Sequence, residues 1–169
     1  RQVNNPYGDD KIIAACSIFG AMNTAGKNFS GKGVIRAIAN MHDRGNGLGG
    51  GFAIYGLYSE YPELYAFHIM YLSQQGQQEA EAFLREKFNL VHQEKVPTRP
   101  VPEITNPPVV WRYFLEVGQR QDEDKSEDDY VVDRVMDINT KLQVGFVFSS
   151  GKDMGVFKGG GYPEEIANY

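Results

Sequence analysis

AACSIFG, at residues 14–20, is the stretch on which the expected fold depends. It holds the single cysteine of the chain, Cys16, between a short apolar run and a glycine. Short apolar runs closed by glycine are typical of buried strands, so we predict a strand over residues 11–20. A lone cysteine is usually a small core residue. A catalytic cysteine is the alternative, because a cysteine that becomes an N-terminus can use its own α-amino group, with a pKa of about 7.7–8.0, as the base.

The composition narrows the class of protein. The chain has 169 residues, 41% of them hydrophobic, and a formal net charge of −5. These values fit one domain, or one domain with an insertion, around a real core. An acidic chain lacks the basic face that nucleic-acid binding needs. A single cysteine cannot form an internal disulfide, and no apolar run approaches the roughly 18 residues of a membrane span. We therefore expect a cytoplasmic protein with no nucleic-acid or membrane partner.

Beyond residue 20, helical and strand patterns alternate. Apolar residues recur at helical spacing over residues 34–41, and Ser30 is a candidate cap for that helix. Strand patterns cover residues 52–56, 64–72, 89–96, 109–117, 143–149 and 154–158, and further helices are expected over 77–88 and, after a cap at Ser126, up to 142. The order strand–helix–strand–strand–helix–strand within residues 64–149 predicts a ferredoxin-like unit.

A glycine-rich stretch, MHDRGNGLGGG at residues 41–51, is the second candidate for chemistry. A dinucleotide-binding loop needs a strand before its glycines and a helix after them, and here the order is reversed. Two interpretations stay open. The glycines end a helix in left-handed conformations, or they let a ligand approach the backbone beside Arg44, whose guanidinium can hold a carboxylate.

Other polar residues give weaker signals. His42, His68 and His92 fall on different elements without metal-ligand spacing, so we expect no metal and no cofactor. His68 lies in an apolar strand and is expected either in the core or on the wet face of a sheet. The acidic run at residues 122–129 is most simply a solvated loop and a helix start. Four tyrosines between residues 55 and 65 either line a pocket or cover a sheet edge.

Taken together, residues 16–20 and 41–51 resemble the class II glutamine amidotransferases. The most similar branch is the stand-alone amidotransferase domain related to glutamate synthase, in which serine follows the cysteine, as Ser17 does here. The resemblance covers about residues 11–58, and the stretch GGGYPEE at 159–165 is similar to the same branch. One departure is that Asp43 separates His42 from Arg44, where the family usually has the histidine directly before the arginine.

The resemblance implies an α+β fold of the N-terminal nucleophile hydrolase type, with stacked antiparallel sheets between helical layers. Residues 16–63 and 150–169 would form part of this αββα domain, residues 1–15 a leader or propeptide, and residues 64–149 the ferredoxin-like insertion. Cys16 would attack glutamine, and Arg44 and Gly45 match the arginine–glycine pair that the family places near the nucleophile and the substrate. The implied partners are glutamine and a synthase domain or subunit that receives ammonia.

Two later motifs of the family are missing from this sequence. They are the arginine–threonine segment for the α-carboxylate of glutamine and the asparagine–glycine pair of the oxyanion hole. One oxyanion donor contributes about 2.7–4 kcal/mol, so we expect the chain alone to hydrolyse glutamine poorly and to need the remaining part of the amidotransferase domain. Two alternatives remain: a non-catalytic small-molecule-binding or assembly module with Cys16 as a core residue, and an N-terminal nucleophile amidase that cuts another amide.

Overall fold

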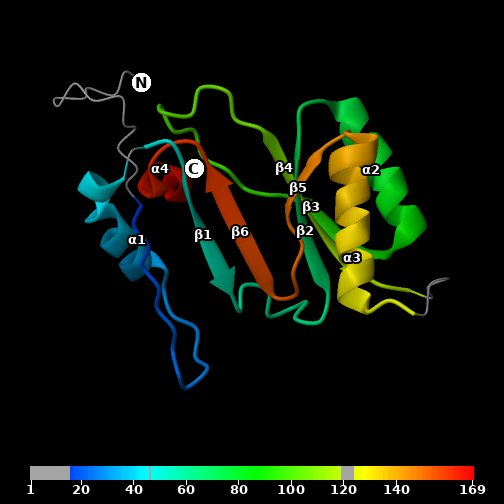
Figure 1. The fold of residues 1–169 in the computed structure, drawn as a ribbon, viewed down its shortest axis with the longest axis horizontal. Helices are drawn as coiled ribbons and strands as arrows, with labels where there is room; N and C mark the ends of the chain where they lie inside the picture. Colours follow the sequence, from blue (N-terminus) through cyan, green and yellow to red (C-terminus); the bar gives the residue numbers. More distant parts are fainter. Residues whose placement is uncertain (1–15, 46, 119–123) are drawn as a thin grey trace.

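The computed structural model describes residues 16–45, 47–118 and 124–169, and these form a mixed α+β fold. A two-stranded antiparallel sheet lies beside a four-stranded antiparallel sheet, and each sheet has its own helices (Figure 1). Within the described ranges, no helix is long and apolar enough to cross a membrane. The two sheets and the helices confirm the α+β class expected from the sequence.

The larger sheet and its helices form what we call the βαββαβ unit, residues 65–149. Its elements are β2 (Tyr65–Tyr71), α2 (Gln74–Lys87), β3 (Asn89–Lys95), β4 (Val109–Glu116), α3 (Glu127–Met136) and β5 (Phe146–Ser149). The strand order across the sheet is β3-β4-β2-β5. The order of elements along the chain is the one that the sequence predicts, and it is the order of a ferredoxin-like unit.

Strand β2 is central and is buried on both faces. Phe67 and Ile69 belong to the main core, together with Leu84 of α2. The intervening Ala66 and His68 face the opposite side and are also fully buried. A strand covered on both faces reads as an almost continuous apolar run, which is why residues 64–72 stand out in the sequence.

Both helices of the βαββαβ unit begin at serine caps. The hydroxyl of Ser73 accepts a hydrogen bond from the amide of Gly76 at 3.0 Å, and Ser126 accepts one from the amide of Asp129 at 3.1 Å. The predicted cap at Ser126 is thus confirmed. These contacts satisfy amides that the first turn of a helix leaves without a partner.

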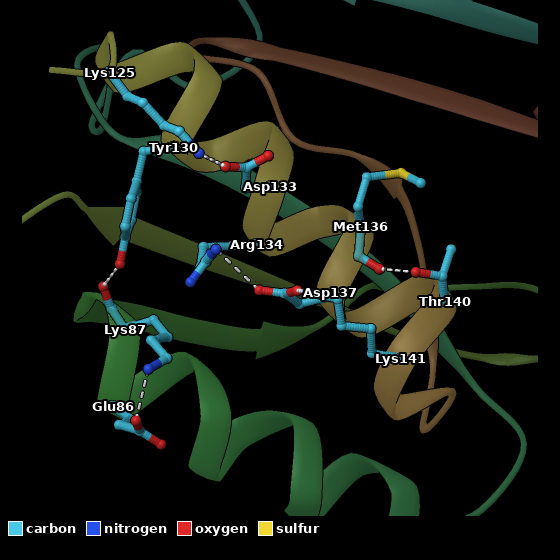
Figure 2. Close-up of polar contacts among 10 residues, drawn as sticks. All are labelled: Glu86, Lys87, Lys125, Tyr130, Asp133, Arg134, Met136, Asp137, Thr140 and Lys141. Atoms are coloured by element: carbon cyan, nitrogen blue, oxygen red, sulfur yellow. Dashed lines mark hydrogen bonds and ion pairs between the residues drawn. The ribbon is translucent and has the colours of Figure 1, made fainter. Parts of the chain in front are cut away.

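Helix α3 continues into a π-helix, η2 (Asp137–Leu142), and Figure 2 shows the polar contacts around this junction. The carboxylate of Asp137 is buried and pairs with Arg134 at 3.1 Å and with Lys141 at 2.6 Å. Tyr130 donates a hydrogen bond to the backbone carbonyl of Lys87 at 3.0 Å, which ties α3 to the end of α2. The two helices that cover the larger sheet are therefore joined by side chains as well as by the core.

The smaller sheet forms the β1–β6 unit, residues 16–57 and 150–169. Its elements are α1 (Lys32–Ala39), the short 3-10 helix η1 (His42–Arg44), β1 (Gly50–Tyr55), β6 (Met154–Gly159) and α4 (Pro163–Asn168). Strands β1 and β6 pair antiparallel, with Gly50 opposite Gly159 and Tyr55 opposite Met154. Helix α4 contacts α1, β1 and β6 on one side of this sheet (Figure 1).

One prediction about the β1–β6 unit is wrong. Residues 16–20 form no strand, and Ile18 is 90% exposed. The remainder of the predicted strand, residues 11–15, and the predicted leader, residues 1–15, lie outside the described residues. An apolar run becomes a strand only where a neighbouring strand accepts its backbone hydrogen bonds and a core covers its side chains. Within the ranges that the structure describes, residues 16–20 have neither.

Candidate functional site

The glycine-rich stretch and the C-terminal helix meet at His42. The ring of His42 stacks on Tyr162, with 3.7 Å between ring centroids, and its Nδ1 lies 2.9 Å from a carboxylate oxygen of Glu164. His42 and Glu164 are 122 residues apart in the sequence. Burial alone would raise the pKa of Glu164. The backbone amide at the start of α4 and the His42 ring act in the opposite direction and outweigh burial, so the pKa of Glu164 lies below its ordinary value. Glu164 therefore carries a negative charge beside the ring at neutral pH.

The glycines at residues 45–51 allow close packing against the C-terminal segment. A Cβ on Gly50 would lie 2.9 Å from the ring of Pro163, and one on Gly51 would lie within 2.3 Å of the Phe157 carbonyl oxygen. Gly47 adopts a positive φ of 68°, which favours glycine. A larger residue at position 50 or 51 would push β1 away from α4 or β6. Contact with β6 and α4 therefore explains Gly50 and Gly51 without a ligand.

Cys16, Arg44 and Gly45, the three residues singled out from the sequence, lie in different surroundings. Gly45 packs near the ring of Tyr162, and Arg44 ends η1 with an exposed side chain. Cys16 is a free, exposed thiol in a segment without helix or strand. In the described part of the chain, no hydrogen bond or ion pair joins Cys16 to Arg44 or Gly45. The alternative that Cys16 is a core residue is also wrong, because its side chain is exposed.

A buried polar cluster, which we call the Tyr58 cluster, lies on the face of the larger sheet away from α2 and α3. The hydroxyl of Tyr58 is 2.5 Å from Nε2 of His68 and accepts a hydrogen bond from Arg112 at 3.2 Å. Arg112 also pairs with Glu94 on the neighbouring strand. The backbone amide of Tyr58 donates to the side chain of Asp153 at 2.7 Å. Tyr58 thus connects the sheet of the βαββαβ unit to the start of β6.

The electrostatics of the Tyr58 cluster favour neutral rings beside a charged guanidinium. Burial, and then the charge of Arg112, lower the pKa of His68 to about 4, against a weaker opposing interaction with the Ala66 backbone. Burial raises the pKa of Tyr58, although Arg112 opposes the shift. His68 is therefore neutral and Tyr58 protonated at pH 7. Of the two positions expected for His68, the structure shows the core.

Two of these interactions could not be expected from the sequence. Glu164 and Tyr162 lie in a short terminal helix start, and nothing in their local pattern indicates a contact with His42. Arg112 occupies an apolar strand beside Trp111, where its charge predicts a solvent-facing position rather than a buried partner for Tyr58. Both contacts join distant segments, and only the pairing of β1 with β6 and of β2 with β4 brings them together.

Comparison with known proteins gives one informative relative. The chain is 48% identical over 163 residues to an uncharacterized protein of Archaeoglobus fulgidus. The match covers 95% of this chain but only 43% of that relative, so the chain spans less than half of the relative's length. No family model matches the chain.

Proposed function

We propose that this chain is part of a class II glutamine amidotransferase of the glutamate synthase-related branch. One observation carries the proposal. The sequence segments that resemble this family, residues 16–58 and 159–165, are separated by about 100 residues but fold into one unit through the β1–β6 pairing and the contact of α4 with β1. The βαββαβ unit then corresponds to the ferredoxin-like insertion, and the β1–β6 unit to a portion of an N-terminal nucleophile hydrolase domain.

The proposed reaction is the hydrolysis of glutamine to glutamate and ammonia. The thiolate of Cys16 attacks the carbon of the side-chain amide, and the tetrahedral intermediate collapses with cleavage of the C–N bond. The departing nitrogen takes up a proton and leaves as ammonia, and water then cleaves the thioester to free glutamate and the thiol. Arg44 and Gly45 would bind the substrate next to the nucleophile, and a synthase domain or subunit would receive the ammonia.

The exposure of Cys16 and Arg44 is compatible with a site that further chain completes. Neither side chain is buried among the residues that the structure describes, where both are accessible to a substrate or to another segment. An exposed thiol reacts only in its thiolate form. The α-amino group of Cys16, once freed by removal of the residues before it, would supply the base.

Affinity labelling tests this proposal. The full-length protein, produced so that it begins at Cys16, is treated with 6-diazo-5-oxo-L-norleucine and digested for mass spectrometry. We expect one adduct on Cys16, competition by glutamine, and no adduct in a Cys16→Ser variant. An Arg44→Met variant should label more slowly, whereas an Arg36→Met variant, changed on α1, should label at the wild-type rate. Absence of the Cys16 adduct would refute the proposal.

A further inference from the structure

We infer that a cavity between α3 and the β5–β6 connection binds a free α-amino acid with an aliphatic side chain. The cavity has a volume of about 530 Å³. Its wall is formed by Tyr65 of β2, by Asp128 and Val131 of α3, and by Ser150 and Lys152 from the segment that leads to β6. The cavity is open to solvent on one side, and its volume falls in the range of about 300–1,000 Å³ for small-molecule sites, so it has room for a single amino acid.

One tyrosine holds the two opposite charges of the cavity close together. The hydroxyl of Tyr65 donates a hydrogen bond to Asp128 at 2.7 Å, and the ammonium group of Lys152 lies 4.7 Å from the centroid of the same ring. Burial, followed by the bond to Asp128, raises the pKa of Tyr65, so its hydroxyl stays protonated and continues to donate. The carboxylates of Asp128 and Glu127 and the ammonium group of Lys152 thus lie around the same tyrosine ring.

Both charged groups retain capacity for a ligand. Lys152 pairs with Glu127 at 2.9 Å, but an ammonium group has three N–H donors. Asp128 accepts from Tyr65 through one carboxylate oxygen, and a carboxylate has two. A zwitterion can therefore place its carboxylate on Lys152 and its ammonium group on Asp128 while the existing contacts persist. A ligand with one charge alone would engage only half of this arrangement.

Apart from Ser149, whose hydroxyl accepts a hydrogen bond from the Val156 amide, the side chains in the remainder of the wall are apolar and select the side chain of the ligand. They belong to Val131 and Val132 of α3 and to Met154 and Val156 of β6. Val131 is buried beneath the cavity, whereas Val132 is 57% exposed. Burial of an aliphatic group of the ligand against these residues removes apolar surface from water on both sides. A branched aliphatic amino acid such as leucine matches this wall better than an acidic or basic one.

A second cavity in the βαββαβ unit lacks these features. It encloses about 580 Å³ near the start of α2, and its wall carries the carboxylate of Glu79 but no lysine or arginine. Glu79 accepts a hydrogen bond from Gln75, and the side chain of Asn139 is bonded to both backbone groups of Val147. Of these two cavities, the one beside Tyr65 alone offers both signs of charge over an apolar wall.

Titration with L-leucine tests this inference on the 169-residue chain, independently of any glutaminase activity. We expect saturable binding at millimolar concentrations by calorimetry, with NMR shifts at Tyr65, Val131 and the 150–152 amides. N-acetyl-L-leucine, which lacks the ammonium group, and L-leucinamide, which lacks the carboxylate, should each bind at least about tenfold more weakly, since each loses a charge-assisted hydrogen bond. Equal binding of either analogue would overturn the assignment.

Variants locate the binding. Lys152→Met and Asp128→Asn should each weaken leucine binding by about tenfold or more, and both replace side chains that reach solvent, so folding is retained. Glu79→Gln, which changes the other cavity, should bind leucine as the wild type does. Circular dichroism checks that each variant is folded. No saturable binding by the wild type, or binding that both cavity variants leave unchanged, would overturn the inference.

Discussion

The two units of the molecule differ in how they are held together. Every buried apolar side chain that the structure describes lies between Tyr58 and Val147, in the βαββαβ unit and the segment leading into it. In the β1–β6 unit, large apolar side chains such as Met22, Leu48 and Tyr55 remain 83%, 67% and 75% exposed. The larger unit has a core of its own, whereas the smaller one is held by strand pairing, glycine contacts and a few side-chain pairs.

This difference has an energetic consequence. Burial of apolar surface contributes about 25 cal/mol per Å² and is the main favourable contribution to folding. A two-stranded sheet is marginal in water without a covered apolar face. We therefore expect the stability of the described chain to reside in the βαββαβ unit, and substitutions in the two units to differ strongly in their cost.

The largest effect should come from the core of the βαββαβ unit. Phe67 is fully buried and packs against Phe88 with 5.4 Å between ring centroids. Phe67→Ala should lower the free energy of unfolding by about 3–5 kcal/mol, through lost burial and the cavity that remains. The matched change in the β1–β6 unit is Phe29→Ala, at a ring that is 52% exposed, and it should cost about 0.5 kcal/mol or less. Urea unfolding of both variants measures the contrast, and equal costs would contradict it.

The next effect is a loss of stability in acid that involves the Tyr58 cluster. The pKa of His68 is lowered from 6.5 to about 4 in the folded chain. As the pH falls from about 6.5 towards 4, the unfolded chain binds a proton at this residue and the folded chain does not, so stability declines by up to about 3 kcal/mol. Above pH 6.5 the contribution is constant.

A difference measurement isolates this contribution from the carboxylates that titrate in the same range. Unfolding free energies of the wild type and of His68→Gln are compared at several pH values between 4 and 7. The variant should be less stable at pH 7, and the gap should narrow as the pH falls. A gap that is independent of pH would show that His68 does not titrate as its burial requires.

The third effect concerns the junction of α3 and η2. Asp137→Ala removes the acceptor for Arg134 and Lys141 and leaves a half-buried guanidinium without this partner (Figure 2). We expect a cost of about 2 kcal/mol, below the range for fully buried pairs because Lys141 reaches solvent. The control is Asp133→Ala, whose carboxylate is exposed and pairs with Lys125, and whose loss should cost clearly less than that of Asp137. Thermal unfolding of both variants distinguishes the two sites.

The smallest effect should appear in the β1–β6 unit. His42→Ala removes the stacking on Tyr162 and the contact with Glu164, both of which are partly exposed. The expected cost is about 1 kcal/mol or less. Hydrogen exchange should show faster exchange in β1 and β6 but no change in β2 and β4, because the loss is local. Equal acceleration in both sheets would mean that the two units unfold together.

The sequence predicted the βαββαβ unit better than the β1–β6 unit, and the reason is physical. In the larger unit each element buries a regular face, so residues such as Val131 and Ile138 mark a helix by their spacing alone. Residues 16–20 have an equally apolar pattern, yet Ile18 and Phe19 are exposed, because no segment that the structure describes covers them. The apolar pattern of a segment shows which of its side chains could be buried. Whether they are buried depends on a second segment that covers them.

The candidate site shows the same limit. The stretch at residues 41–51 was recognisable by its glycines, but the partners that fix it, Tyr162 and Pro163, are more than 100 residues away. The glycines therefore indicate where another part of the chain can approach closely, but the sequence does not indicate which part does so. The proposed roles of Cys16 and Arg44 rest on resemblance, and the labelling experiment is their direct test.

The register of β1 and β6 has a further consequence for how such a chain can change. Tyr55 and Met154 are direct partners, and the amides of Gly56 and Leu57 both donate to the carbonyl of Asp153. The chain thus leaves the small sheet and re-enters it at one point. In topological terms, the whole βαββαβ unit occupies the position of a hairpin turn. Replacement of this unit by a two-residue turn would leave the β1–β6 pairing in register. The βαββαβ unit can therefore be gained or lost at this point of the chain without a change in the pairing of the small sheet.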